Sequence, residues 1–162
     1  MSDAQPAAQQ ELEACLRKLV IAVDAVDTKS PRGAAAHLTE VHPFDGPDVS
    51  RVFELCELGL DEGWLVPRSA GKHVRYGRMA SDMGGYAVDI VVMENAAGLG
   101  HTHTRGEINM CFALNGEPLF DGHPPGWVVF SPGSHHVPTV EGGTMLFVYF
   151  TPGGEVVWDP RP

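Results

Sequence analysis

The chain of 162 residues is long enough for one ordinary domain and leaves no room for a second of similar size. Its hydrophobic residues make up 43%, which fills one core and exceeds what an intrinsically disordered protein carries. The 21 acidic and 11 basic residues give a formal charge of −10, and such a surface repels phosphate backbones and anionic lipids. We therefore expect neither nucleic acid nor a membrane among the partners.

The sequence also bears on compartment and redox chemistry. No stretch approaches the roughly 18 consecutive apolar residues of a membrane-spanning helix, and the start MSDAQPAAQQELEA lacks the basic-then-apolar order of a signal peptide. We expect a cytoplasmic protein. Cys15, Cys56 and Cys111 are an odd number without metal-like spacing, and each lies in an apolar run. These cysteines are expected to be reduced and structural.

The first third of the chain has helical periodicity. Apolar residues recur every three or four positions over 9–27, which predicts a helix with one apolar face. A short alanine-rich helix is expected over 33–42, ended by Pro43. Asp48 is a candidate cap for a third helix, which Gly63 should terminate. Residues 1–63 are therefore predicted to form a helical N-terminal annex.

Beyond Trp64 the helical period gives way to short β-branched and aromatic runs. Turn sequences separate them, among them Asn115-Gly116 and Asp121-Gly122. At least six strands are expected, at 74–79, 86–94, 107–114, 127–130, 145–151 and 155–158. Helices followed by antiparallel strands predict a mainly β fold, a barrel or sandwich over residues 64–162, with the annex packed on it as a single structural unit.

Four of the eight histidines fall in two tight groups, in GLGHTHTRGE and SPGSHHVP. On an extended chain His101 and His103 point to the same face, and Glu107 shares their parity. A further histidine could come from a neighbouring strand if SPGSHH is a turn. Imidazoles together with a carboxylate suit zinc, iron, manganese, nickel or copper, so the clustering points to a metal site.

These two segments resemble the metal-binding motifs of the cupin superfamily. The first reads His101-Thr102-His103-Thr104-Arg105-Gly106-Glu107, and the second follows Gly126-Trp127 as PGSHH, with Ser131 where a proline is usual. The resemblance covers about residues 70–158. It implies an antiparallel β-barrel of the jelly-roll type, and it implies His101, His103, Glu107 and His136 as ligands of a divalent transition metal.

His135 remains a rival to His136, because a shift of one residue in strand register reverses which side chain faces inward.

A closer resemblance covers almost the whole chain. The helical N-terminus, GHTHTRGEINMCFAL, GEPLFDGHPPGWVVFSPGSHHVPTV and GGTMLFVYFTPGGEVVW are similar to the small cupin-type 4-hydroxylaminobenzoate lyase family. The resemblance implies conversion of 4-hydroxylaminobenzoate to 3,4-dihydroxybenzoate with release of ammonia. The cofactor would be zinc, iron, manganese or nickel, and the partner a small aromatic carboxylate.

The implied reaction needs proton transfer and a site for the substrate carboxylate. His135 or Glu107 is the candidate for proton transfer if one of them is not a tight ligand. Arginine suits a carboxylate, and the candidates are Arg105, Arg78 and Arg75. The candidates for lining the cavity are Asn109 and Cys111, which share the parity of Glu107, and Tyr149 as an aromatic wall.

Two other functions fit the same motifs. One is a cupin dioxygenase or isomerase that acts on another small aromatic acid, and the other is a non-catalytic cupin that binds a small ligand. The absence of a basic helix-turn-helix in the sequence disfavours a DNA-binding sensor. Cupins commonly pair through their sheets, so the resemblance also implies a homo-oligomer.

Overall fold

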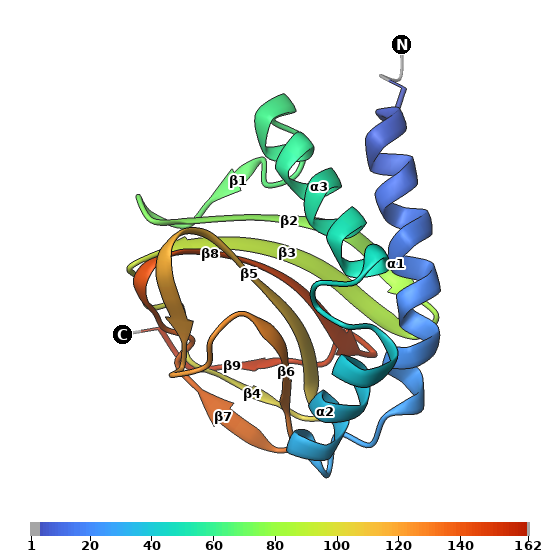
Figure 1. Cartoon of the computed structure of the whole chain (residues 1–162). Helices are drawn as coiled ribbons and strands as arrows, with labels where there is room; N and C mark the ends of the chain where they lie inside the picture. The colour runs from blue at the N-terminus through green and yellow to red at the C-terminus, as the bar shows by residue number, and fades with distance from the viewer. Residues whose placement is uncertain (1–3, 162) are drawn as a thin grey trace.

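The computed structural model describes residues 4–161, which form three helices followed by nine strands (Figure 1). The helices are α1 (Ala7–Ala25), α2 (Pro31–Val41) and α3 (Pro47–Glu62). The apolar positions that predicted α1 become its buried face, which includes Leu12, Leu16 and Leu19. The three predicted helices are confirmed, with boundaries shifted by about two residues.

The ends of α3 confirm one predicted signal and correct another. Gly63 follows the helix in the left-handed conformation, with φ of 83°, as a helix-terminating glycine should. Asp48, however, does not cap the helix, because Pro47 already occupies the first turn and Asp48 lies inside it. The Asp48 carboxylate instead pairs with Lys18 Nζ at 3.0 Å and with His42 Nδ1 at 3.2 Å.

The strands form two antiparallel sheets. The larger sheet has six strands in the order β1-β2-β3-β8-β5-β6, and the smaller has the order β7-β4-β9. The strands of the larger sheet are β1 (Arg68–Ser69), β2 (Val74–Met83), β3 (Tyr86–Glu94), β5 (Glu107–Phe120), β6 (Gly126–Phe130) and β8 (Val140–Pro152). Those of the smaller are β4 (His101–His103), β7 (Ser134–His136) and β9 (Val157–Trp158).

This arrangement confirms the predicted mainly β jelly roll with helices at its N-terminus. It corrects the expectation of a closed barrel, because the two sheets share no ladder of backbone hydrogen bonds among the described residues.

The Asn115-Gly116 pair is not the turn that the sequence predicted. It lies inside β5, where Asn115 pairs with Thr144 and Gly116 with Gly143 of β8. Gly116 has φ of 73°, and the register shifts on either side of it, so the extra residues are absorbed as a bulge. The two strands therefore continue beyond this point, to Phe120 and back from Val140.

The two faces of the six-stranded sheet have different roles. The outer face packs against the helices in one hydrophobic core, to which the sheet contributes Ile90, Ile108, Met110, Val148 and Phe150. The inner face turns toward the three-stranded sheet (Figure 1). The predicted alternation along 107–112 is confirmed, because the even-numbered residues face the helices and the odd-numbered ones face inward.

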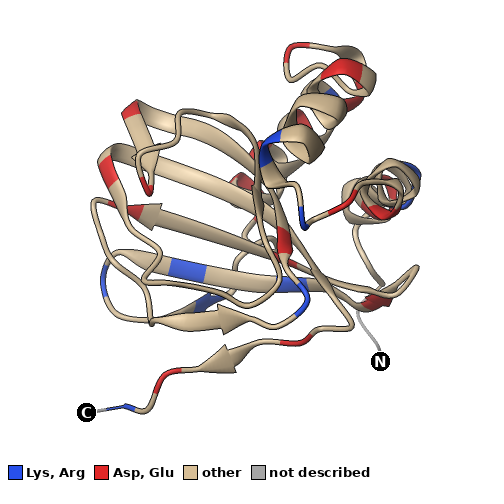
Figure 2. Cartoon of the chain, turned by 90° about the horizontal axis from the view of Figure 1, so that it is seen from below, with Lys and Arg blue, Asp and Glu red and all other residues tan. Residues whose placement is uncertain are grey.

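Charge is spread over the molecule. Figure 2 shows Asp and Glu on the helices, the turns and the C-terminal segment, with Lys and Arg scattered among them. Within residues 4–161, no helix has both the length and the apolarity to cross a membrane.

Tyr86 links α1 to the sheet through a hydrogen bond, and loss of its hydroxyl should destabilise the protein. Its hydroxyl donates a hydrogen bond to Asp24 Oδ1 of α1 at 3.0 Å, and burial with this bond raises the pKa of Tyr86 to about 12. Tyr86→Phe should lower the free energy of unfolding by about 1 kcal/mol in urea titrations. The difference should be constant below pH 10 and shrink toward pH 12, because tyrosine in the unfolded chain ionises first.

Tyr76→Phe is the control, since Tyr76 lies on β2 and is 38% exposed, so that its hydroxyl is accessible to water. An equal loss in both variants would show that the bond to Asp24 does not contribute.

Candidate metal and substrate site

Three histidine rings converge where β4 and β7 pair. His101 lies directly opposite His136 in this antiparallel pair, and His103 lies two residues further along the same face of β4. The Nε2 atom of His136 is 3.2 Å from that of His101 and 2.9 Å from that of His103. His103 is fully buried and His101 nearly so. The pleat predicted from the H-x-H spacing thus brings these nitrogens to one point.

Hydrogen bonds at the far side of two rings fix where the protons are. His101 Nδ1 lies 2.8 Å from the carbonyl oxygen of Leu99, and His136 Nδ1 lies 2.5 Å from Asp121 Oδ2. Both oxygens only accept hydrogen bonds, so each Nδ1 carries the proton. Burial also lowers the pKa of His101, which favours its neutral form. In neutral rings the two Nε2 atoms therefore present lone pairs to each other.

Two nitrogen lone pairs that face each other repel, and a cation bound between them removes this repulsion. Imidazole nitrogens held by outer hydrogen bonds are the usual ligands of zinc, iron, manganese and nickel, and the outer bonds orient the ring. The three histidines therefore fit a divalent transition metal. Nothing in a set of three imidazoles distinguishes among these metals.

Glu107 lies behind one of these rings. Its Oε2 atom is 3.0 Å from His103 Nδ1, the nitrogen on the far side from the three convergent atoms. The direction is poor for a hydrogen bond, and no other described residue supplies a partner to this buried nitrogen. The structure thus brings three of the four predicted ligands together and places the fourth, Glu107, against His103 and at the wall of the cavity.

His135 points away from this cluster. Because β7 alternates, His136 faces inward, while the His135 side chain is half exposed on the other face. His135 Nε2 lies 2.8 Å from Asp159 Oδ2, and the residue is not among those that line the cavity. The geometry thus separates the two neighbours that the sequence left as rivals.

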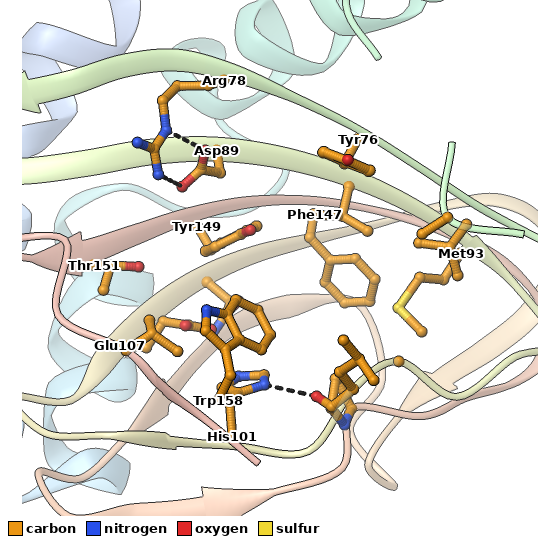
Figure 3. Close-up of a pocket in the computed structure, with 18 of the residues that line it drawn as sticks. Tyr76, Arg78, Asp89, Met93, His101, Glu107, Phe147, Tyr149, Thr151 and Trp158 are labelled. Atoms are coloured by element: carbon orange, nitrogen blue, oxygen red, sulfur yellow. Dashed lines mark hydrogen bonds and ion pairs between the residues drawn. The ribbon is translucent and has the colours of Figure 1, made fainter. Parts of the chain in front are cut away.

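A cavity of about 1260 Å³ lies between the two sheets, with the histidines on one side (Figure 3). A polar row crosses its opposite wall, where Arg78, Asp89, Tyr149 and Asn109 are successive cross-strand neighbours on β2, β3, β8 and β5. A parallel apolar row contains Phe147 and packs beside it. This wall is suited to a ring that carries a polar group.

The arginines predicted to bind a carboxylate differ in their surroundings. Arg78 lines the cavity, but Asp89 already holds its guanidinium through Nε at 2.8 Å and Nη2 at 3.2 Å, which also raises the pKa of Arg78. Arg105 is exposed outside the cavity, against the turn at Gly153. Arg75 is also exposed and lies outside the cavity lining.

Two cavity arginines were missed from the sequence. Arg68 and Arg161 both line the cavity. Arg68 is on a two-residue strand whose place depends on pairing with Tyr76. No local pattern marks such a position, because only the distant pairing brings it to the cavity.

Tyr149 supplies an uncharged polar group at the centre of the wall. Burial raises the pKa of its hydroxyl well above the ordinary value, and the carboxylates of Asp89 and Glu107 raise it further. The phenol therefore stays protonated and can donate a hydrogen bond into the cavity. Asn109 lies beside it and donates to the carbonyl oxygen of Val128 at 3.4 Å.

Comparison with known proteins identifies the family. The profile described as PnbB: 4-hydroxylaminobenzoate lyase matches residues 18–158, which is most of the chain. The chain belongs to the 4-hydroxylaminobenzoate lyase family. This confirms the resemblance drawn from the sequence motifs, and it makes the chain a member of a lyase family with a jelly-roll fold.

Two individual relatives carry the same family name, and their sequence identity to this chain is modest. A 4-hydroxylaminobenzoate lyase of Nocardioides sp. (strain LMS-CY) is 29% identical over 123 residues, covering 69% of this chain and 73% of the relative. A protein of the same name from Pseudomonas putida is 26% identical over 141 residues, covering 75% and 80%. Among solved structures, an RmlC-like cupin protein from Ralstonia eutropha JMP134 aligns with a TM-score of 0.45 and 15% identity, over 60% of this chain and 66% of that one.

Loss of either histidine of β4 should remove the metal. Changing even an outer partner of a metal ligand costs about 10- to 100-fold in affinity, so losing a ligand should cost more. His101→Ala and His103→Ala should each lose most bound metal, measured by elemental analysis after equilibration with Zn²⁺, Mn²⁺, Fe²⁺ or Ni²⁺ in turn. Circular dichroism should show an intact fold. Full occupancy in either variant would exclude that histidine as a ligand.

The two neighbours on β7 should respond differently. His136→Ala removes one of the three convergent nitrogens, whereas His135→Ala removes an outer contact with Asp159. His136→Ala should therefore release the metal, and His135→Ala should retain it in the same elemental analysis. The opposite ranking would mean that β7 is shifted by one residue.

Proposed function

We propose that this protein is a metal-dependent lyase that converts 4-hydroxylaminobenzoate to 3,4-dihydroxybenzoate and ammonia. The observation that carries the proposal is the convergence of the Nε2 atoms of three histidines at the edge of a cavity whose opposite wall combines aromatic and polar side chains. Membership of the 4-hydroxylaminobenzoate lyase family supports the choice of substrate.

The proposed reaction consumes one water and is redox neutral. The N–O and C–N bonds break, the ring gains two C–O bonds in place of one C–N and one C–H bond, and the nitrogen leaves as ammonia. The atoms balance as one hydroxylaminobenzoate and one water giving one dihydroxybenzoate and one ammonia. Neither dioxygen nor a nicotinamide cofactor enters this balance.

Different residues would bind the metal and transfer the proton. His101, His103 and His136 would hold a divalent metal, which at such a site supplies Lewis acidity and lowers the pKa of water. Glu107 lines the cavity beside His103 and is our candidate to accept and return a proton near the hydroxylamine group. His135 has no such position, because it faces outward.

The polar row on the opposite wall would bind the substrate carboxylate. Tyr149 donates from a neutral phenol, and Arg78 retains the guanidinium hydrogens that Asp89 does not engage. Asn109 lies next to Tyr149 in the same row. The carboxylate and the hydroxylamine group of the substrate are para to each other on the ring. We place the carboxylate at the polar row because this row and the histidines are on opposite sides of the cavity (Figure 3).

The source of the product oxygen tests the reaction. Metal-loaded protein incubated without dioxygen should release ammonia and dihydroxybenzoate in equal amounts. In oxygen-18 water the dihydroxybenzoate should carry label at a ring oxygen, because the balanced equation takes one oxygen from water. Mass spectrometry of the product measures this label, with product incubated alone as the control for exchange.

Label that comes only from oxygen-18 dioxygen would exclude the lyase reaction. It would favour a dioxygenase that uses the same histidines.

A further inference from the structure

The C-terminal segment of the chain crosses the metal side of the cavity. Its strand β9 pairs with β4, so that Trp158 lies opposite His101 and Val157 opposite Thr102. Val156, Trp158, Asp159 and Arg161 all line the cavity. Residues 156–161, which we call the C-terminal strap, therefore form part of the site although they come last in the sequence.

Trp158 is placed as a wall for an aromatic ring. Its ring centroid is 4.8 Å from that of His101, with a tilt of 57°, and Figure 3 shows the indole over His101 and facing the cavity. The residue is still 58% exposed, so the protein leaves much of its surface uncovered. Phe147 and Tyr149 lie across the cavity on the large sheet.

Two contacts hold the strap beside the histidines. The backbone N–H of Asp159 donates to the carbonyl oxygen of Gly100 at 3.0 Å, and the Asp159 carboxylate accepts from His135 Nε2 at 2.8 Å. Gly100 has no side chain, and a Cβ there would overlap the Asp159 carboxylate. His135 therefore contacts the strap, although it faces away from the three convergent histidine nitrogens.

We propose that Trp158 is the specificity-determining residue that packs on the aromatic ring of the substrate, and that the His135–Asp159 pair positions it. This inference rests on the proposed function for the identity of the substrate class. An indole and a benzoate ring stack favourably, whereas a saturated ring of the same size gains only apolar contact. The strap would therefore select aromatic over aliphatic carboxylates.

Calorimetric binding of two unreactive ligands tests the proposal on the metal-loaded full chain. The ligands are 4-hydroxybenzoate and trans-4-hydroxycyclohexanecarboxylate, which share polar groups and differ in ring type. Trp158→Leu should weaken binding of the aromatic ligand by about tenfold and of the saturated ligand by less than about twofold, because leucine keeps apolar contact but loses stacking. Val157→Ala is the matched control, since this side chain is on the same strand and outside the cavity lining. It should leave both affinities unchanged.

The Asp159→Asn variant tests the positioning contact. It weakens the hydrogen bond from His135 without altering Trp158, and should reproduce part of the loss of aromatic preference while metal content stays at the wild-type level. A preference unchanged in Trp158→Leu would overturn the proposal. So would metal loss in that variant, which would make Trp158 a support for His101, or a changed oligomeric state by light scattering, which would make it an interface residue.

The test of the binding role of Trp158 can fail or succeed independently of the test of the lyase reaction. If aromatic preference depends on Trp158 but 4-hydroxylaminobenzoate is not turned over, the reaction is wrong and the binding role stands. If turnover occurs with equal preference in wild type and Trp158→Leu, the binding role is wrong and the reaction stands.

Discussion

The pairing of β4 with β7 is the constraint on which the site depends. These two short strands come from segments more than thirty residues apart, and their register sets His101 directly opposite His136. A shift of one residue would turn His136 outward and His135 inward. It would also separate the nitrogen atoms that now lie 3.2 Å apart. The convergence of the three histidines and the position of the strap both depend on this register, because β9 continues the same small sheet along the other edge of β4.

The helices make a polar inner face possible. Because α1, α2 and α3 cover the outer face of the six-stranded sheet, the main hydrophobic core lies between helices and sheet. Phe112 shows the arrangement, since its ring stacks on Phe44 at 4.8 Å and on Phe53 at 4.9 Å. The inner face is thereby freed to carry Arg78, Asp89 and Tyr149, which would be costly in the middle of a core.

The sequence could predict what depends on local spacing. The common face of His101 and His103 follows from the pleat, and the inward direction of Asn109 follows from its parity with Glu107. It left His135 and His136 unresolved, because that choice depends on pairing with a distant strand. It missed Arg68, which reaches the cavity through a two-residue strand too short to leave a pattern. It predicted a strand at 155–158, but the place of Trp158 opposite His101 depends on pairing with the distant β4. Glu107 has the predicted parity, yet its contact with the far nitrogen of His103 depends on the turn between the strands.

The mistaken turn at Asn115-Gly116 shows how an irregularity in one strand serves the site. Because β5 absorbs these residues as a bulge and continues to Phe120, the true turn falls at Asp121, which adopts φ of 47°. A non-glycine residue in this region is strained and persists only when its surroundings hold it. Here the Asp121 carboxylate is held at both oxygens, accepting from the backbone N–H of Thr139 at 2.9 Å and from His136 Nδ1. The bulge therefore carries the chain to a position from which the Asp121 carboxylate accepts a hydrogen bond from His136 Nδ1, which leaves the Nε2 lone pair of His136 directed toward the other two histidines.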